Sequence, residues 1–346
     1  MLKFFQSLFA GKTEAPEPSE PAVDSAPPPE VVAIDGAESF PFAAHISIVN
    51  KLPYVDWAAV EAWIAKLSSS DRQGEAWSLC ERAWLLHLAA ALGPDYRLAE
   101  ANDALLLSSL EPNVASATLE FMDLTLRRIV DALDDVAAVP EWGKDILIVF
   151  DDEQKYYEYV SHYYEDEGEF ATSGGMFIHD GCSHFVTVKS DLSAIEPVIV
   201  HEMTHGCVAH LPLPAWLNEG IAVNMERRIM GSRPSLYSPS ELCEKHLEFW
   251  GQNEIQQFWS GESFHRPDNG QMLSYDLARI MVEQMAKDWE AFREFVLAAD
   301  RADARSAAAM AFLDVDLGEF IAAFLAARGE SRAGGAFLVV NDRHEG

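Results

Sequence analysis

Positive charge is scarce in this sequence. Its 346 residues include 25 Lys and Arg against 56 Asp and Glu, which gives a formal net charge of -31. A surface of this sign repels the phosphates of nucleic acids and the anionic headgroups of membranes. We therefore expect no nucleic-acid partner.

Cysteine is also rare. The four cysteines, Cys80, Cys182, Cys207 and Cys243, lie far apart, and no pair has the Cys-x-x-Cys spacing. Such a distribution is typical of a reducing compartment, where thiols stay free. We expect no structural disulfide and a cytoplasmic location.

Long hydrophobic runs are missing as well. No apolar run reaches the ~18 residues that a transmembrane helix needs, so we expect no transmembrane segment. The opening "MLKFFQSLFAGK" has only a short, interrupted apolar patch and does not fit a cleaved signal peptide. As a helix, residues 1–12 would carry Leu2, Phe5 and Phe9 on one stripe. This amphipathic segment predicts weak docking to a membrane surface or a partner.

Residues 13–41 contain few large apolar side chains. The stretch "EAPEPSEPAVDSAPPPE" is rich in Pro, Glu, Ala and Ser, so it has little to bury against the entropy cost of ordering. We interpret residues 13–41 as a disordered linker. Removal of residues 11–40 is then expected to leave thermal stability unchanged.

The rest of the chain has ample core-forming residues, because 49% of all residues are hydrophobic. The length favours two packed subdomains plus tails. Residues 42–94, with Trp and Leu at helical spacing and a Gly93-Pro94 stop, predict a helical lead-in. Residues 95–211 predict a mixed α/β subdomain. Its elements are a strand in 103–110, a helix over 113–136, a strand in 145–152, a helix from 153 and a hairpin over 173–190.

The second half of the chain has a mainly helical pattern. Residues 212–330 predict a helical C-terminal subdomain, with irregular loops over 234–268 and two short helices over 307–329. Residues 331–346 predict a loose tail. The expected fold class is therefore α+β, with a mixed α/β half followed by an all-helical half and the active cleft between them.

The stretch "IVHEMTHG", residues 199–206, carries the most specific chemical pattern. Ile199, Val200 and Met203 recur at helical spacing, and Ser193 with Glu196 resembles a capping box, so we expect a helix here. A chance His-Glu-x-x-His among 11 histidines is on the order of a few per cent, so the pattern needs further support.

On this helix, His201 and His205 lie about 40° apart around the axis and one turn apart along it. Both imidazoles can therefore reach one ion. Glu202 follows His201 too closely to chelate the same ion, but it is well placed to accept a proton from an attacking water.

A catalytic zinc ion needs a third protein ligand. The segment "LPLPAWLNEGIAVNMERR" predicts a second helix, with Pro214 near its start and Gly231 at its end. On this helix Glu219 has Val223 on its own face, and an ion would compensate its charge in such apolar surroundings. Glu226, two turns further on, is expected to lie on the surface, too far along the axis to share the ion.

Other histidines have simpler interpretations. His87 is expected to be an ordinary core or surface histidine within its helix. His179 and His184 flank the Asp-Gly turn of the predicted hairpin, and we assign them to the rim of that turn and not to a metal site with Cys182.

The motif "HEMTH", followed after thirteen residues by Glu219 in "LPAWLNEGIA", resembles the gluzincin zinc metallopeptidases, and among them the peptidase MA-like superfamily. The resemblance is specific over residues 197–225 and looser from about 98 to 328. It implies a zincin-like fold in which His201, His205 and Glu219 bind zinc and Glu202 is the general base.

The chain departs from this family at one position. Val223 stands where thermolysin-like enzymes carry an aspartate that orients a ligand histidine, and valine cannot accept a hydrogen bond. Asn224 lies about 140° around the helix from Glu219 and does not obviously replace that aspartate.

The resemblance also implies that a tyrosine stabilises the oxyanion, which makes Tyr275 the candidate and His265 the runner-up. The expected function is zinc-dependent hydrolysis of peptide bonds in a peptide or protein substrate. One alternative is a catalytically silent zinc-binding protein that binds peptides or a protein partner; another is a structural module without a tightly held metal. The run "GGMFIH" is expected to be an edge strand that pairs with an extended peptide, its glycines admitting the substrate backbone.

Overall fold

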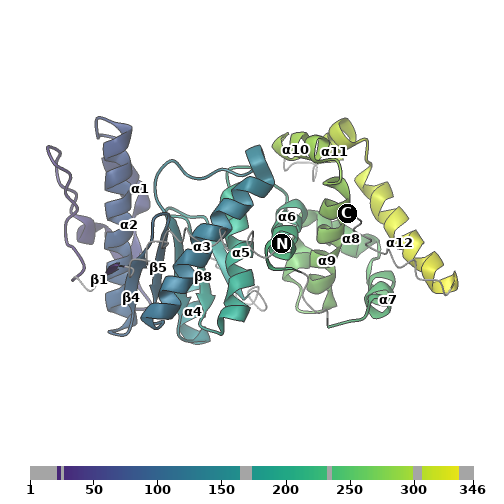
Figure 1. Cartoon of the computed structure of the whole chain (residues 1–346), viewed down its shortest axis with the longest axis horizontal. Coiled ribbons are helices and arrows are strands. Elements are labelled where there is room, and N and C mark those ends of the chain that lie inside the picture. The colour runs from purple at the N-terminus through teal and green to yellow at the C-terminus, as the bar shows by residue number, and fades with distance from the viewer. Residues whose placement is uncertain (1–21, 25–26, 164–173, 232–235, 299–305, 335–346) are drawn as a thin grey trace, which may run out of the picture.

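The computed structural model describes residues 22–24, 27–163, 174–231, 236–298 and 306–334. Within these residues the fold is α+β, as predicted: a mixed sheet with helices on both faces, followed by a helical half (Figure 1). The predicted N-terminal amphipathic segment, 1–12, lies outside the described residues, and so does the tail from 335. None of the helices described combines the length and apolarity of a membrane span.

The described part of the sheet has six strands. In spatial order they are β1 (Ala22–Asp24), β4 (Arg97–Glu100), β5 (Ala104–Ser108), β6 (Asp145–Phe150), β8 (His184–Val188) and β7 (Gly175–Ile178). The central strands β5, β6 and β8 are parallel, and the outer pairings are antiparallel. Every residue of β5 is buried, which is typical of strands that are covered on both faces.

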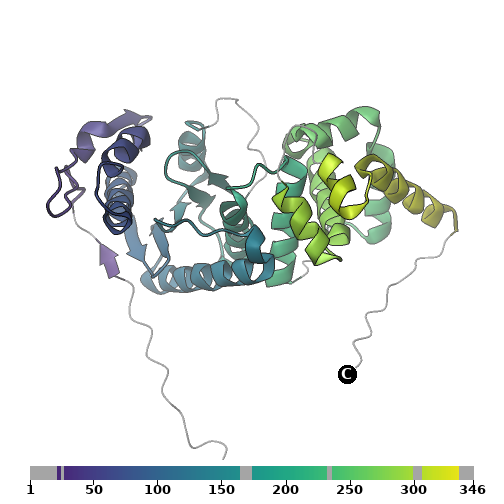
Figure 2. The same ribbon diagram turned by 90° about the horizontal axis from the view of Figure 1, so that it is seen from above.

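Two layers of helices cover the sheet (Figures 1 and 2). On one face lie α1 (Trp57–Ile64), α2 (Ser70–Leu92) and α4 (Glu153–Val160); on the other lie α3 (Pro112–Leu133), followed by the short η2 (Asp134–Val136), and α5 (Leu192–Val208). Successive strand residues alternate between the layers: Leu105 and Leu107 join the α2 side, whereas Leu106 joins the α3 side.

The core on the α3 side continues into the helical half without interruption. That half contains α6 (Ala215–Met230), α7 (Pro239–Phe249), α8 (Gln252–Ser260), η3 (Glu262–His265), α9 (Asn269–Met285), α10 (Trp289–Leu297), α11 (Ser306–Leu313) and α12 (Leu317–Gly334). Because α5, α6 and α9 share one core, the two halves hold each other in place. This continuity gives a cleft between them a defined shape.

The strand and helix succession predicted between 103 and 190 is confirmed, and so are the two helices predicted over 307–329. The prediction of loops over 234–268 is wrong, because α7, α8 and η3 occupy that stretch. The Ser238 and Glu241 side chains form a capping box, and Pro239 stands at the first helical position. This start signal is visible in the sequence "SPSE".

The linker prediction for 13–41 is wrong over its described residues, because β1 already pairs with β4 in the sheet. Val32 forms a bridge with Phe40, and the side chains of Val32, Ile34 and Phe40 are only 4–5% exposed. They belong to the core on the α2 side. Because these three side chains are buried, we now expect removal of residues 27–41 to lower the stability, contrary to the prediction made for residues 11–40.

The helical lead-in also needs correction at its start. Helices α1 and α2 form as expected, and α2 ends at Gly93, whose φ of 125° suits glycine. Before them, however, come η1 (Phe42–His45) and a hairpin of β2 (Ile46–Val49) and β3 (Leu52–Val55). Asn50 and Lys51 form its two-residue turn with positive φ, as the right-handed twist of the strands favours.

Candidate metal centre

Helix α5 presents the His-Glu-x-x-His motif to the cleft. It begins after Asp191 and not at the predicted Ser193–Glu196 capping box, so Pro197 lies inside the helix. Ile199, Val200 and Met203 pack into the core beneath it. Because those residues face the sheet and α3, the imidazoles one turn apart face the opposite side, toward α6.

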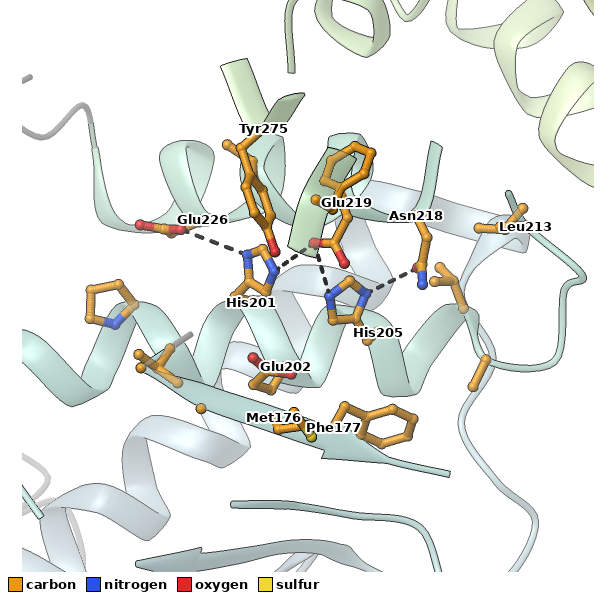
Figure 3. Close-up of a pocket in the computed structure, with 18 of the residues that line it drawn as sticks. Met176, Phe177, His201, Glu202, His205, Leu213, Asn218, Glu219, Glu226 and Tyr275 are labelled. Carbon is orange, nitrogen blue, oxygen red and sulfur yellow. Dashed lines mark hydrogen bonds and ion pairs between the residues drawn. The ribbon is translucent and has the colours of Figure 1, made fainter. Parts of the chain in front are cut away.

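Three predicted ligands converge across the cleft between α5 and α6 (Figure 3). His201 Nε2 lies 3.1 Å from Glu219 Oε2, and His205 Nε2 lies 3.5 Å from the same oxygen. One donor atom from each residue lies within 4.8 Å of the other two. Within the described residues this is the only group of three His, Cys, Asp or Glu so placed.

The donor set fits zinc, which binds imidazole nitrogen and carboxylate oxygen at about 2.0–2.2 Å. Donors at that distance around a tetrahedral ion lie roughly 3–4 Å apart, close to the spacings seen here. His201, His205 and Glu219 would therefore fit such an ion.

The electrostatics of the cluster favour a cation. Burial lowers the pKa of His201, but the hydrogen bond to Glu219 and the nearby carboxylate of Glu226 raise it to about 10. Burial alone would raise the pKa of Glu219, yet the charge of His205 and the hydrogen bond of His201 hold it well below its usual range. Glu219 thus needs positive charge beside it, which a divalent ion supplies in place of protons.

The second nitrogen of each imidazole faces an oxygen acceptor. His205 Nδ1 lies 3.0 Å from Asn218 Oδ1, and His201 Nδ1 lies 3.8 Å from Glu226 Oε2. The prediction that Glu226 lies on the surface is therefore wrong, because its side chain is 24% exposed and lines the cleft. That prediction considered only whether Glu226 could share the ion, although two helical turns after Glu219 it lies on the same face of the helix.

Glu202 lies between the imidazoles and β7 (Figure 3) and is 6% exposed. Burial raises the pKa of its carboxyl, whereas the charges of His201 and His205 and the backbone N–H of Phe177 lower it. A carboxyl with a raised pKa, held beside the ligands but outside their group, suits a general base.

Tyr275, from α9, reaches the same site. Its ring centre lies 6.2 Å from that of His201, and its hydroxyl points toward Glu219 (Figure 3). Burial, together with the charges of Glu219 and Glu202, raises its pKa well above the usual value, so the hydroxyl keeps its proton. The runner-up His265 also lines the cleft, from η3, with an exposed side chain.

The cleft has a volume of about 650 Å³ and lies between the two halves. Strand β7 and helix α5 line one side, and α6, η3 and α9 line the other. Beyond the ligands it has an apolar stretch, formed by Val208, Leu211 and Leu213.

Gly175, at the start of β7, serves packing. A Cβ on Gly175 would clash with Val198 Cγ1 and would lie 2.9 Å from the carbonyl oxygen of Val186. Gly175 therefore lets β7 approach α5 closely. The close approach also brings β7 against Glu202. Gly174 and Gly175 also line the cleft, and their role in substrate approach stays a prediction.

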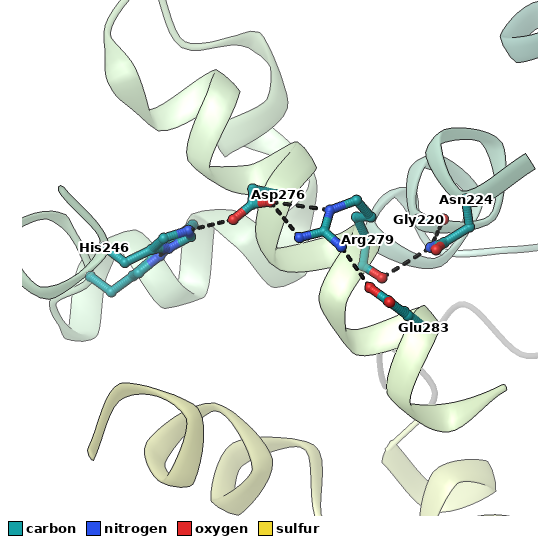
Figure 4. Close-up of polar contacts among 7 residues, drawn as sticks. Gly220, Asn224, His246, Asp276, Arg279 and Glu283 are labelled. Atoms are coloured by element: carbon teal, nitrogen blue, oxygen red, sulfur yellow. Dashed lines mark hydrogen bonds and ion pairs between the residues drawn. The ribbon is translucent and has the colours of Figure 1, made fainter. Parts of the chain in front are cut away.

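Helices α6 and α9 pack closely beside the site and are joined by a hydrogen bond (Figure 4). A Cβ on Gly220 would lie 2.7 Å from the carbonyl oxygen of Ala278, so the helices touch at the residue after Glu219. Asn224 donates to the carbonyl oxygens of Gly220 and Arg279, which turns it away from the ligands. It does not replace the missing acceptor at Val223.

A buried polar chain fixes α9 on its other side (Figure 4). Trp250 Nε1 donates to His246 Nδ1, so the proton of this ring is on Nε2, which donates to Asp276 at 2.9 Å. Arg279 also donates to Asp276. These bonds tie α7 to α9, the helix that carries Tyr275.

The remaining candidate histidines do not join the ligand cluster. His87 Nε2 contacts the carbonyl oxygen of Pro29. His184 is buried, with Nδ1 donating to the carbonyl of Cys182 and Nε2 bonded to the hydroxyl of Tyr159. His179 Nδ1 bonds to the Ser183 hydroxyl.

No protein-family model matches the chain, and no curated protein matches it significantly in sequence. The fold and the site define an α+β protein with a His-His-Glu cluster in the cleft between its halves. Any function assigned to it must therefore be argued from this geometry.

Proposed function

We propose that this protein is a zinc-dependent metallopeptidase that hydrolyses peptide bonds of a peptide or protein substrate. The convergence of His201, His205 and Glu219, with Glu202 buried beside them, carries the proposal. A structural cation site would need only the ligands. A fourth residue with a carboxyl that does not bind the ion, placed in an open cleft, is the addition that hydrolysis requires.

His201, His205 and Glu219 would bind the ion. When bound, zinc supplies a Lewis acid that polarises the scissile carbonyl and acidifies water. Glu202 accepts the proton of the attacking water and delivers it to the leaving amine, as a carboxyl of raised pKa can do in both directions. The protonated Tyr275 hydroxyl donates a hydrogen bond to the developing oxyanion.

The edge strand β7 supports a peptide as the substrate. Among the strands that the structure describes it pairs only with β8, and it lines the cleft next to Glu202. An extended peptide can add to such an edge by backbone hydrogen bonds, which are independent of its sequence. We also propose a cytoplasmic location, with which the four free cysteines are compatible.

Two glutamates of the site provide the test. Glu219→Ala removes a ligand and should abolish tight zinc binding. Glu202→Gln keeps all three ligands, so zinc should stay near one per chain while cleavage of a peptide library falls by roughly 10²–10⁴-fold. Glu248→Gln, exposed on α7, is the control and should change neither. Zinc content is measured by elemental analysis.

The outcomes separate the candidate functions. Wild-type protein without zinc would refute the metal centre. Zinc without cleavage would favour the silent peptide-binding protein. Equal zinc loss in both glutamate variants would show that their proposed roles are wrong.

A further inference from the structure

We propose that Glu226 is a positioning residue that holds His201 in the orientation needed for metal binding. The inference rests on the proposed zinc centre and assigns a task to a side chain outside the ligand group. It also names what stands in for the acceptor missing at Val223.

The two ligand histidines are arranged alike. In each ring, Nε2 faces Glu219, and Nδ1 faces an oxygen on α6. For His205 that oxygen is the amide of Asn218, and for His201 it is the carboxylate of Glu226 (Figure 3). The ring of His201 therefore lies between two carboxylates of the same helix.

This arrangement selects a tautomer. An imidazole that binds a cation through Nε2 must carry its proton on Nδ1, and a largely buried N–H needs an acceptor. A carboxylate in this place makes the ring a stronger ligand, because it stabilises the charge drawn toward the metal. Glu226 is the acidic side chain within ion-pair distance of His201 Nδ1.

The length of the Glu226 side chain decides whether its carboxylate can contact His201. Glu219 and Glu226 are separated by about 10 Å along the helix axis, so His201 must span the gap between them. At 3.8 Å the Nδ1–Oε2 distance is longer than a hydrogen bond. A rotation of the Glu226 side chain would be needed to close that gap, and the shorter aspartate would leave it open.

The test measures zinc affinity by chelator competition and the visible spectrum of the cobalt-substituted protein. Glu226→Ala should weaken zinc binding by roughly 10–100-fold and alter the cobalt bands, as loss of a ligand's outer partner typically does. Glu226→Gln retains an oxygen acceptor and should lose less, and Glu226→Asp should resemble alanine. Asn218→Ala, which frees the other imidazole, is the benchmark, and Glu248→Ala is the control.

Thermal unfolding of the metal-free proteins checks that the substitutions act on the metal and not on folding. If Glu226→Ala is too unstable to purify, the isosteric Glu226→Gln decides, with a drop of a few-fold expected. Zinc affinity within about twofold of wild type in both variants, with unchanged cobalt bands, would overturn the role of Glu226 alone. Absence of zinc from the wild type would instead overturn the metal centre, and this inference with it.

Discussion

Glu81 offers a test of the fold that does not depend on the metal centre. It lies on α2, 2% exposed, in the core on the α2 side. Trp77 Nε1 donates to its Oε1 at 2.6 Å, and the Cys182 thiol lies 3.8 Å from the same oxygen. Burial raises the pKa of Glu81 to about 7, although these donors and Lys144 oppose the rise.

The direction in which stability changes with pH follows from proton linkage. A carboxyl whose pKa is higher in the folded than in the unfolded state binds its proton more tightly when folded. Its contribution to stability is complete below the unfolded value of 4.5 and is lost as the pH rises through about 7. At ~1.4 kcal/mol per pH unit, Glu81 should lower the free energy of unfolding by about 2–3 kcal/mol between about pH 5 and about pH 8.

The substitution that tests this is Glu81→Gln. The glutamine amide resembles the protonated acid, and its oxygen can still accept the hydrogen bond from Trp77. Relative to wild type, the variant should gain about 2–3 kcal/mol between the two pH values, measured by urea denaturation. Asp145, whose pKa burial also raises to about 7, is present in both proteins and cancels in the difference. Glu75→Gln, exposed on the same helix, is the control. A stability difference that is the same at both pH values would refute the reasoning.

Three further substitutions test the packing. Gly220→Ala would force α6 away from the backbone of Ala278, so we expect a loss of about 1–3 kcal/mol in urea denaturation, together with weaker zinc binding; unchanged values would contradict the close approach. Phe40→Ala should cost about 3–5 kcal/mol, because the ring is buried; a melting temperature equal to that of wild type would restore the linker interpretation. Gly175→Ala should shift β7 off Val198 and reduce peptide cleavage, and full cleavage would show that β7 does not shape the site.

The candidate ligands were predictable because their pattern is local. His201 and His205 need only a helix to share a face, and a helix is favoured by the apolar spacing of residues 199–203. Glu219 required a second helix and an argument about an uncompensated charge. The structure brings all three together, and it also places Tyr275 beside them.

The linker error arose where local pattern and tertiary contact disagree. Residues 27–41 look disordered by composition, but Val32, Ile34 and Phe40 find a core that α1 and α2 provide. The prediction of loops where α7 and α8 lie has a different cause. The capping box at Ser238 is a local sequence signal for the start of a helix, and the prediction did not use it.

Local sequence by itself determined the type and order of most elements, the histidine pair on one helical face and the sign of the surface charge, since each depends on residues close together in the chain. The partners of those histidines were decided only by the tertiary structure. The crossing of α5 and α6 sets which oxygens of α6 meet each ring, so Glu226 reaches His201 whereas Asn224 turns toward α9. The sequence spacing on a helix gives the face on which a side chain lies. Which residue of the other helix it contacts depends on how the two helices pack.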